Sequence, residues 1–153
     1  MAQSKDIWRK IVVLAVVGGL AFWATSIATS LLPIAADYRA ARWNAQTVWV
    51  GSLPAGMIIG FFVSFFLLRF FKKIPTKNPI LKSVILSLIA LIIGTIILEA
   101  PASFRTSDAL YYFLFGTMLN LPRFLFVGIV IGYLYKRLYK GFNPSAIASE
   151  EHA

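Results

Sequence analysis

Arg123 is the residue of this sequence with the clearest chemical potential, because it lies inside a long apolar stretch at residues 109–135. A charge at the centre of a bilayer costs between ~2.5 and more than ~10 kcal/mol, so it persists only where other groups satisfy it. The planar guanidinium suits phosphate or carboxylate, because two parallel N–H groups can bind both oxygens at once. Arg123 is therefore the first candidate for a functional site.

The neighbours of Arg123 add polar groups at the same depth of the membrane. Pro122 has no N–H to donate and so frees the carbonyl of Met118. Asn120 precedes Arg123 by three residues and shares its helix face. Helical side chains lean toward the N-terminus, so we expect the guanidinium to point at these groups. The predicted ligand-binding site comprises Met118, Asn120, Pro122 and Arg123.

Three kinds of group are candidates to satisfy the guanidinium. The first is neutral and internal, namely the freed carbonyl and the Asn120 amide together with water. The second is the anionic group of a small solute or lipid in a hydrated cavity. The third is an acidic residue of another subunit, in which case the protein is incomplete alone. The six acids of this chain all fall at or beyond the expected ends of the spans: Asp6, Asp37, Glu99, Asp108, Glu150 and Glu151.

The chemistry typical of enzymes is missing from this sequence. The chain has no cysteine and a single histidine, His152, beside the C-terminus. Haem or a catalytic metal would need several such ligands within the membrane. There is also no glycine-rich phosphate loop and no Ser-His-Asp set. We expect no enzyme activity, no cofactor and no metal. A membrane-embedded transferase that uses Asp37, Glu99 or Asp108 is the remote alternative.

Long apolar segments must position these residues. Of the 153 residues, 59% are hydrophobic, which is more apolar surface than a soluble domain of this size can bury. Four segments, at about 11–34, 47–71, 80–99 and 109–135, approach or exceed the ~20 residues that cross a bilayer as a helix. Their lack of alternation excludes a β-barrel. The expected fold is all-α, with one four-helix transmembrane bundle over residues 1–153 and short cytoplasmic tails.

Local signals mark some helix boundaries. Asn78 followed by Pro79 fits an N-cap with proline at the first helical position. Pro101 lies just beyond the third segment, where we expect it to end the helix.

The distribution of basic residues predicts the orientation. Eleven lie near the span ends on one side, and three lie on the other side. The larger group comprises Lys5, Arg9, Lys10, Arg69, Lys72, Lys73, Lys77, Lys82, Lys136, Arg137 and Lys140. The smaller group comprises Arg39, Arg42 and Arg105. The positive-inside rule therefore places both termini in the cytoplasm. The formal charge of +9 then indicates anionic lipid headgroups on the cytoplasmic side as partners, rather than nucleic acid.

Small residues predict close helix packing. The second segment carries them at strict four-residue spacing, and the fourth carries a glycine pair at the same spacing. The predicted packing residues are Ser52, Gly56, Gly60, Ser64, Gly128 and Gly132. Such stripes serve packing within one bundle or an interface with another subunit, and the sequence leaves both open. Pro54 predicts a kink in the second helix, and Ser26 and Thr29 in the first are able to hydrogen-bond across helices.

These observations predict a non-catalytic, multi-pass protein of the plasma or inner membrane. Its polar site around Arg123 would bind or transport a small anionic solute or lipid. The alternative is an accessory or assembly subunit of a larger membrane complex, or a homo-oligomer, with Arg123 and the small-residue stripes as contacts.

Overall fold

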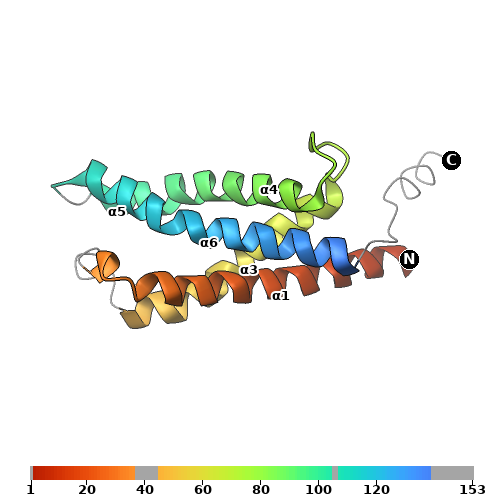
Figure 1. Ribbon diagram of the computed structural model, residues 1–153, viewed down its shortest axis with the longest axis horizontal. Coiled ribbons are helices and arrows are strands. Elements are labelled where there is room, and N and C mark those ends of the chain that lie inside the picture. Colours follow the sequence, from red (N-terminus) through yellow and green to blue (C-terminus); the bar gives the residue numbers. More distant parts are fainter. Residues whose placement is uncertain (1, 37–44, 105–106, 139–153) are drawn as a thin grey trace.

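The computed structural model describes residues 2–36, 45–104 and 107–138, and these ranges form helices and short connections without a strand. The long helices are α1 (Ala2–Ser30), α3 (Ala45–Arg69), α4 (Pro79–Gly94) and α6 (Ala109–Leu138) (Figure 1). The α4 helix continues through a π-helical turn, η1 (Thr95–Glu99), into α5 (Ala100–Ser103). Within these described ranges, four helical stretches are long and apolar enough to cross a membrane. The expected all-α architecture with four membrane-length helices is therefore confirmed.

The first helix is displaced from its expected limits. It begins at Ala2 and ends at Ser30, whereas the apolar pattern predicts a span at 11–34. Pro33 explains the early end, because a proline disfavours helical geometry in the residue before it. The chain instead makes tight turns here, with the amide of Leu32 donating to the carbonyl of Thr29 at 3.3 Å.

The expectation that Pro101 ends the third helix is wrong. The helix passes through Pro101 and runs on to Ser103. Within the π turn the amide of Ala100 donates to the carbonyl of Thr95, five residues earlier. A π turn is wider than an α turn, so the chain can accommodate a proline ring that has no N–H to donate. The predicted start of this helix is confirmed, since the Asn78 side chain accepts from the amide of Ile80 at 3.0 Å.

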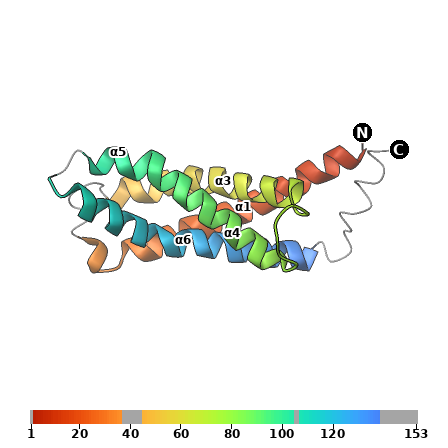
Figure 2. The same ribbon diagram turned by 90° about the horizontal axis from the view of Figure 1, so that it is seen from above.

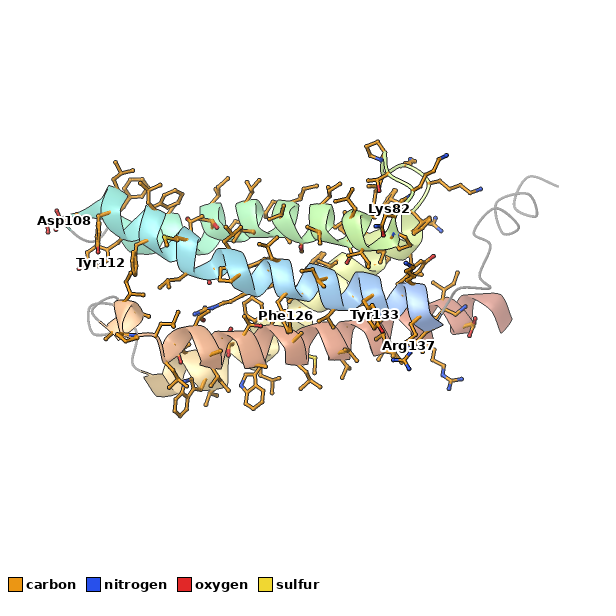
Figure 3. The ribbon with its side chains drawn as sticks, viewed as in Figure 1. Lys82, Asp108, Tyr112, Phe126, Tyr133 and Arg137 are labelled. Carbon is orange, nitrogen blue, oxygen red and sulfur yellow. The ribbon has the colours of Figure 1, made fainter. Side chains whose placement is uncertain are left out.

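The helices form two antiparallel pairs, α1 with α3 and α4 with α6, which meet mainly along α1 and α6 (Figures 1 and 2). We call the end with the start of α1, the α3–α4 connection and the end of α6 the basic end. Figure 3 labels Lys82 and Arg137 there and Asp108 at the opposite end. The described basic residues at the basic end include Arg9, Lys10, Arg69, Lys72, Lys73, Lys77, Lys82, Lys136 and Arg137.

Glycines of α3 lie against α1 within the same chain. A Cβ atom added to Gly60 would lie 2.6 Å from the carbonyl oxygen of Ala15, and one added to Gly56 would lie 2.8 Å from that of Gly19. Both distances are far below van der Waals contact, so only glycine permits this approach of the two backbones. Ser52 and Ser64, which extend the stripe, are also buried.

The second pair packs in the same way. A Cβ atom added to Gly132 of α6 would lie 2.5 Å from the Cα atom of Ile80, and one added to Gly128 would clash with the Ser87 hydroxyl. Both small-residue stripes therefore pack against helices of the same chain. Pro54 lies inside α3 and Pro122 lies inside α6.

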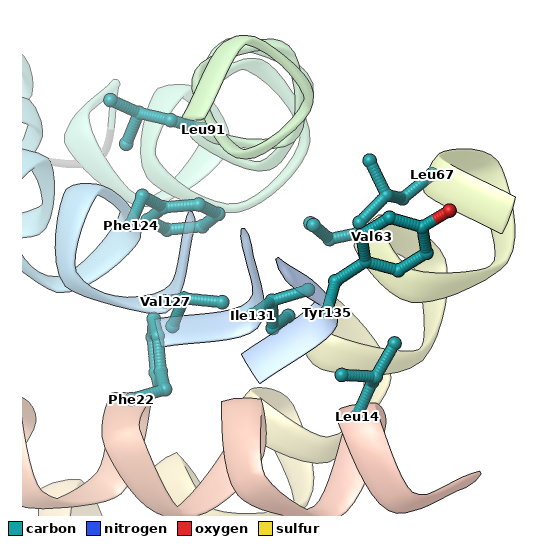
Figure 4. Packing of buried hydrophobic residues seen from close by; sticks show 9 residues of the cluster. All are labelled: Leu14, Phe22, Val63, Leu67, Leu91, Phe124, Val127, Ile131 and Tyr135. Carbon is teal, nitrogen blue, oxygen red and sulfur yellow. The ribbon is translucent and has the colours of Figure 1, made fainter. Parts of the chain in front are cut away.

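The hydrophobic core fills only part of the bundle's length. Its members extend from the edge-to-face contact of Phe22 and Phe124 to the basic end (Figure 4). The cluster comprises Leu14, Phe22, Val63, Leu67, Leu91, Phe124, Val127, Ile131 and Tyr135. Beyond Phe22 and Phe124, toward the opposite end, the buried residues of the described chain are small or polar. They are Ser26, Thr29, Ser30, Ala35, Ser52, Thr95 and Gly116.

Lys82 is a buried cation that the sequence pattern assigned to the headgroup region. It is only 4% exposed, and its ammonium group donates to the backbone carbonyl of Phe71. The same ammonium lies 3.8 Å from the centre of the Phe71 ring, which stacks on Tyr135. A cation is favoured at this place, because the end of α3 carries the negative end of the helix dipole. Lys82 of α4 thereby contacts the segment that follows α3 and, through the Phe71 ring, connects it to α6 at the basic end.

Candidate functional site

The candidate site forms where α6 passes the last turns of α1. Phe124, the next residue after Arg123, meets Phe22 of α1 with ring centres 5.5 Å apart. The start of α6 lies at the opposite end, so a side chain that leans toward the N-terminus of its helix reaches toward that end. Arg123 follows this rule and contacts α1 almost two turns beyond Phe22.

Two neutral oxygen atoms hold the guanidinium. Its Nε donates to the hydroxyl oxygen of Thr29 at 2.8 Å, and its Nη1 donates to the side-chain oxygen of Asn120 at 3.0 Å. Thr29 is buried, whereas Arg123 and Asn120 are half-buried. The two bonds fix the plane of the guanidinium from two different helices, and neither acceptor carries a formal charge.

Thr29 belongs to a polar strip on the last turns of α1. Its hydroxyl donates to the backbone carbonyl of Ser26 at 3.2 Å, so its oxygen can accept from Arg123. Ser26 in turn donates to the carbonyl of Phe22 at 2.8 Å, and Ser30 donates to that of Ile27. The sequence suggested that Thr29 bonds across helices but did not pair it with Arg123. The spacing of Ser26, Thr29 and Ser30 was the available signal.

The four residues of the sequence-based site divide into two groups. Asn120 lies beside the guanidinium, as its spacing predicts. Met118 is 64% exposed and Pro122 is also exposed, so their side chains lie on the outer surface of α6. The prediction for Met118 and Pro122 concerned the backbone carbonyl of Met118, which stays a prediction. Thr29, 94 positions earlier in the chain, joins Asn120 beside the guanidinium.

The guanidinium lies nearer the opposite end than the sequence suggested. Lys136 lies in the last turn of α6 and is a natural boundary at the basic end. Arg123 is thirteen residues from it, or about 20 Å of a hydrocarbon core of ~30 Å. The side chain then extends further outward to Thr29, the penultimate residue of α1. The guanidinium is therefore displaced from the middle of α6 toward the opposite end of the bundle.

Tryptophans of α1 and α3 support this depth. The indole N–H of Trp49 donates to the hydroxyl of Ser30 at 3.0 Å, and that of Trp23 donates to the backbone carbonyl of Trp49 at 3.0 Å. Tryptophan is enriched where the hydrocarbon core meets the headgroups. Because Ser30 follows Thr29 directly, the guanidinium and this aromatic belt lie at a similar level.

A guanidinium held in a fixed plane can bind an oxyanion. Charge-assisted bonds from arginine to phosphate or carboxylate are among the strong hydrogen bonds of proteins, and a fixed guanidinium plane adds geometric selectivity. Within residues 2–36, 45–104 and 107–138, no group of three or more His, Cys, Asp or Glu side chains could hold a metal ion.

Comparison with known proteins gave no relative: no family model, no curated protein and no solved structure matches this chain.

Proposed function

We propose that this chain is a non-catalytic integral membrane protein of the plasma or inner membrane. Its Arg123 site binds the anionic group of a small solute or a lipid, for transport or for retention. One observation carries the proposal: a half-buried guanidinium, oriented by the neutral oxygens of Thr29 and Asn120. The two bonds fix the plane of the guanidinium, and a guanidinium in a fixed plane can bind two oxygen atoms of a phosphate or carboxylate at once.

The energetic cost of the arginine supports a role in recognition. A half-buried cation within a span loses part of its hydration, and replacing buried charges by apolar side chains of similar volume is often neutral or stabilising. A purely structural contact between α1 and α6 would therefore not require arginine. The alternative role as an accessory subunit is less favoured, because the small-residue stripes lie against helices of the same chain.

The proposal includes an orientation with the basic end in the cytoplasm, in agreement with the positive-inside rule. Arg123 then faces the outer leaflet. The chain has no cysteine, so an introduced cysteine is the only thiol that a maleimide can label. We expect Ser107→Cys at the opposite end to react with a membrane-impermeant maleimide in intact spheroplasts. Lys77→Cys, at the basic end, should react only after permeabilisation. The reverse pattern would show that the bundle is inserted the other way.

The proposed activity is tested with a pair of matched variants of α6. Arg123→Gln removes the guanidinium from the site, and Arg137→Gln makes the same change at an exposed position of the basic end. Two measurements separate the sources of the anion: retention of phosphatidylglycerol during purification, and binding of inorganic phosphate or acetate by protein in phosphatidylcholine vesicles. We expect wild type and Arg137→Gln to bind at least one of these probes.

Arg123→Gln should weaken that binding at least ~10-fold, because loss of a charge-assisted bond costs about 1.5–3 kcal/mol. Lipid retention alone would assign a headgroup, and binding of phosphate or acetate would assign a soluble anion. Equal binding by Arg123→Gln and wild type would refute the proposed function.

A further inference from the structure

We propose that all four helices share one hinge level, the layer of Phe22 and Phe124, and that the part of the bundle beyond it moves to open and close access to Arg123. The hinge is inferred from helix geometry and packing. Only the purpose of the motion, which is access of an anion to Arg123, rests on the proposed function.

The two prolines of the spans lie next to this layer. Pro122 precedes Phe124 by two residues. Pro54 of α3 precedes Gly56 by two residues, and a Cβ atom added to Gly56 would lie 2.9 Å from the Cβ of Phe22. Each proline removes one backbone hydrogen bond from its helix and makes a local weak point.

The third span is irregular at the same level. A Cβ atom added to Gly94 would lie 3.8 Å from the Phe124 ring. The π turn begins at the next residue, Thr95, and Pro101 follows it. Single π turns inside helices often lie at functional sites and, like prolines, account for sharp bends.

The first helix has a different weakness at this level. The hydroxyl of Thr25 donates to the carbonyl of Ala21 at 2.6 Å, and that of Ser26 donates to the carbonyl of Phe22 at 2.8 Å. Such bonds to the carbonyl four residues earlier often bend helices. Each of the four helices thus carries, at or next to this layer, a feature that can bend a helix.

Packing differs sharply on the two sides of the layer. On the basic side the helices are held together by glycine contacts, by the hydrophobic core and by the bond from Lys82 to the carbonyl of Phe71. On the other side the buried residues of the described chain are small or polar. Toward the opposite end, α6 also leaves α1 and approaches α5 (Figures 1 and 2). The bond between Arg123 and Thr29 joins the two pairs on this loosely packed side.

The expected amplitude follows from the length of the moving arm. The part of α6 before Pro122 contains thirteen residues, or about 20 Å of helix. A bend of about 20° at Pro122 would displace the tip of this arm by about 7 Å. Such a displacement is large enough to uncover a guanidinium and small enough to leave the glycine contacts intact.

Distance measurements between pairs of spin labels test the hinge. One pair, at Ala28→Cys and Leu110→Cys, joins exposed positions of α1 and α6 beyond the layer. The control pair, at Val12→Cys and Leu138→Cys, joins the same helices at the basic end. In phosphatidylcholine vesicles without added anion, we expect a distribution wider by about 7 Å for the first pair than for the control. Equal widths for the two pairs would overturn the hinge.

A helix variant with the same labelled positions gives a second test of the hinge. Pro122→Ala restores the missing backbone bond in α6, and we expect it to narrow the distribution of the first pair while leaving the control pair unchanged. Should Pro122→Ala fail to fold, Pro54→Ala makes the same comparison in α3. An unchanged distribution in the folded variant would contradict the proposal. Because no anion is present, the hinge can stand if Arg123 binds nothing, and anion binding can stand if the bundle is rigid.

Discussion

Replacing Gly60 by alanine will lower the stability of the folded bundle, whereas the same replacement at Gly51 will raise it. Both glycines lie in α3, so each substitution brings the same intrinsic gain in helix propensity of about 0.5–1 kcal/mol. They differ in their surroundings. A Cβ atom at Gly60 would meet backbone atoms of α1 at 2.6 and 3.1 Å, while one at Gly51 has nothing within 4 Å.

Backbone atoms cannot move aside as the end of a flexible side chain can, so α1 and α3 must separate to admit the methyl group of Gly60→Ala. Overpacking of this kind costs about 1–3 kcal/mol, which exceeds the propensity gain. Unfolding of both variants in mixed micelles of mild detergent and dodecyl sulfate measures the difference. If Gly60→Ala were as stable as Gly51→Ala, the close packing of α1 on α3 would be incorrect.

The Arg123→Leu variant will insert and fold with a stability equal to or above that of the wild type, and it will not bind the anion. Leucine removes the desolvation cost of the guanidinium. Thr29 keeps its bond to the carbonyl of Ser26, so its hydroxyl remains satisfied. The same substitution is thus expected to retain or raise the stability of the bundle and to abolish anion binding.

This opposition separates recognition from a structural role. If Arg123 serves mainly to join α1 and α6, then Arg123→Leu should destabilise the bundle by about 1.5–3 kcal/mol, the typical contribution of hydrogen bonds to charged groups. Thermal unfolding of the two purified proteins without added anion decides between these outcomes. A clear loss of stability in Arg123→Leu would favour the structural role.

Much of the fold was predictable because the signals are local. Twenty or so consecutive apolar residues suffice to indicate a membrane-length helix, and Asn78 before Pro79 suffices to mark the start of α4. Pro101 misled the prediction because a π turn upstream accommodates it. Proline predicts a helix end only when the preceding turns stay α-helical.

The site was predictable in part for the same reason. Asn120 shares a helix face with Arg123, so spacing alone brings them together. Thr29 comes from a different span, and its place depends on the register of α1 against α6, which the packing of residues such as Gly18 and Ile131 sets. Lys82 was assigned to the headgroup region for a similar reason, since only the folded α3–α4 corner buries it.

Anion binding at Arg123 is measured by the shift in unfolding temperature that an anion produces. A ligand that binds only the folded state stabilises it, by about 2.7 kcal/mol at one hundred times its Kd. Phosphatidylglycerol, inorganic phosphate and acetate are each titrated into wild type and Arg123→Leu in the same neutral detergent. We expect at least one of them to raise the unfolding temperature of the wild type and to leave that of Arg123→Leu unchanged. Equal shifts in the two proteins, or no shift in either, would contradict it.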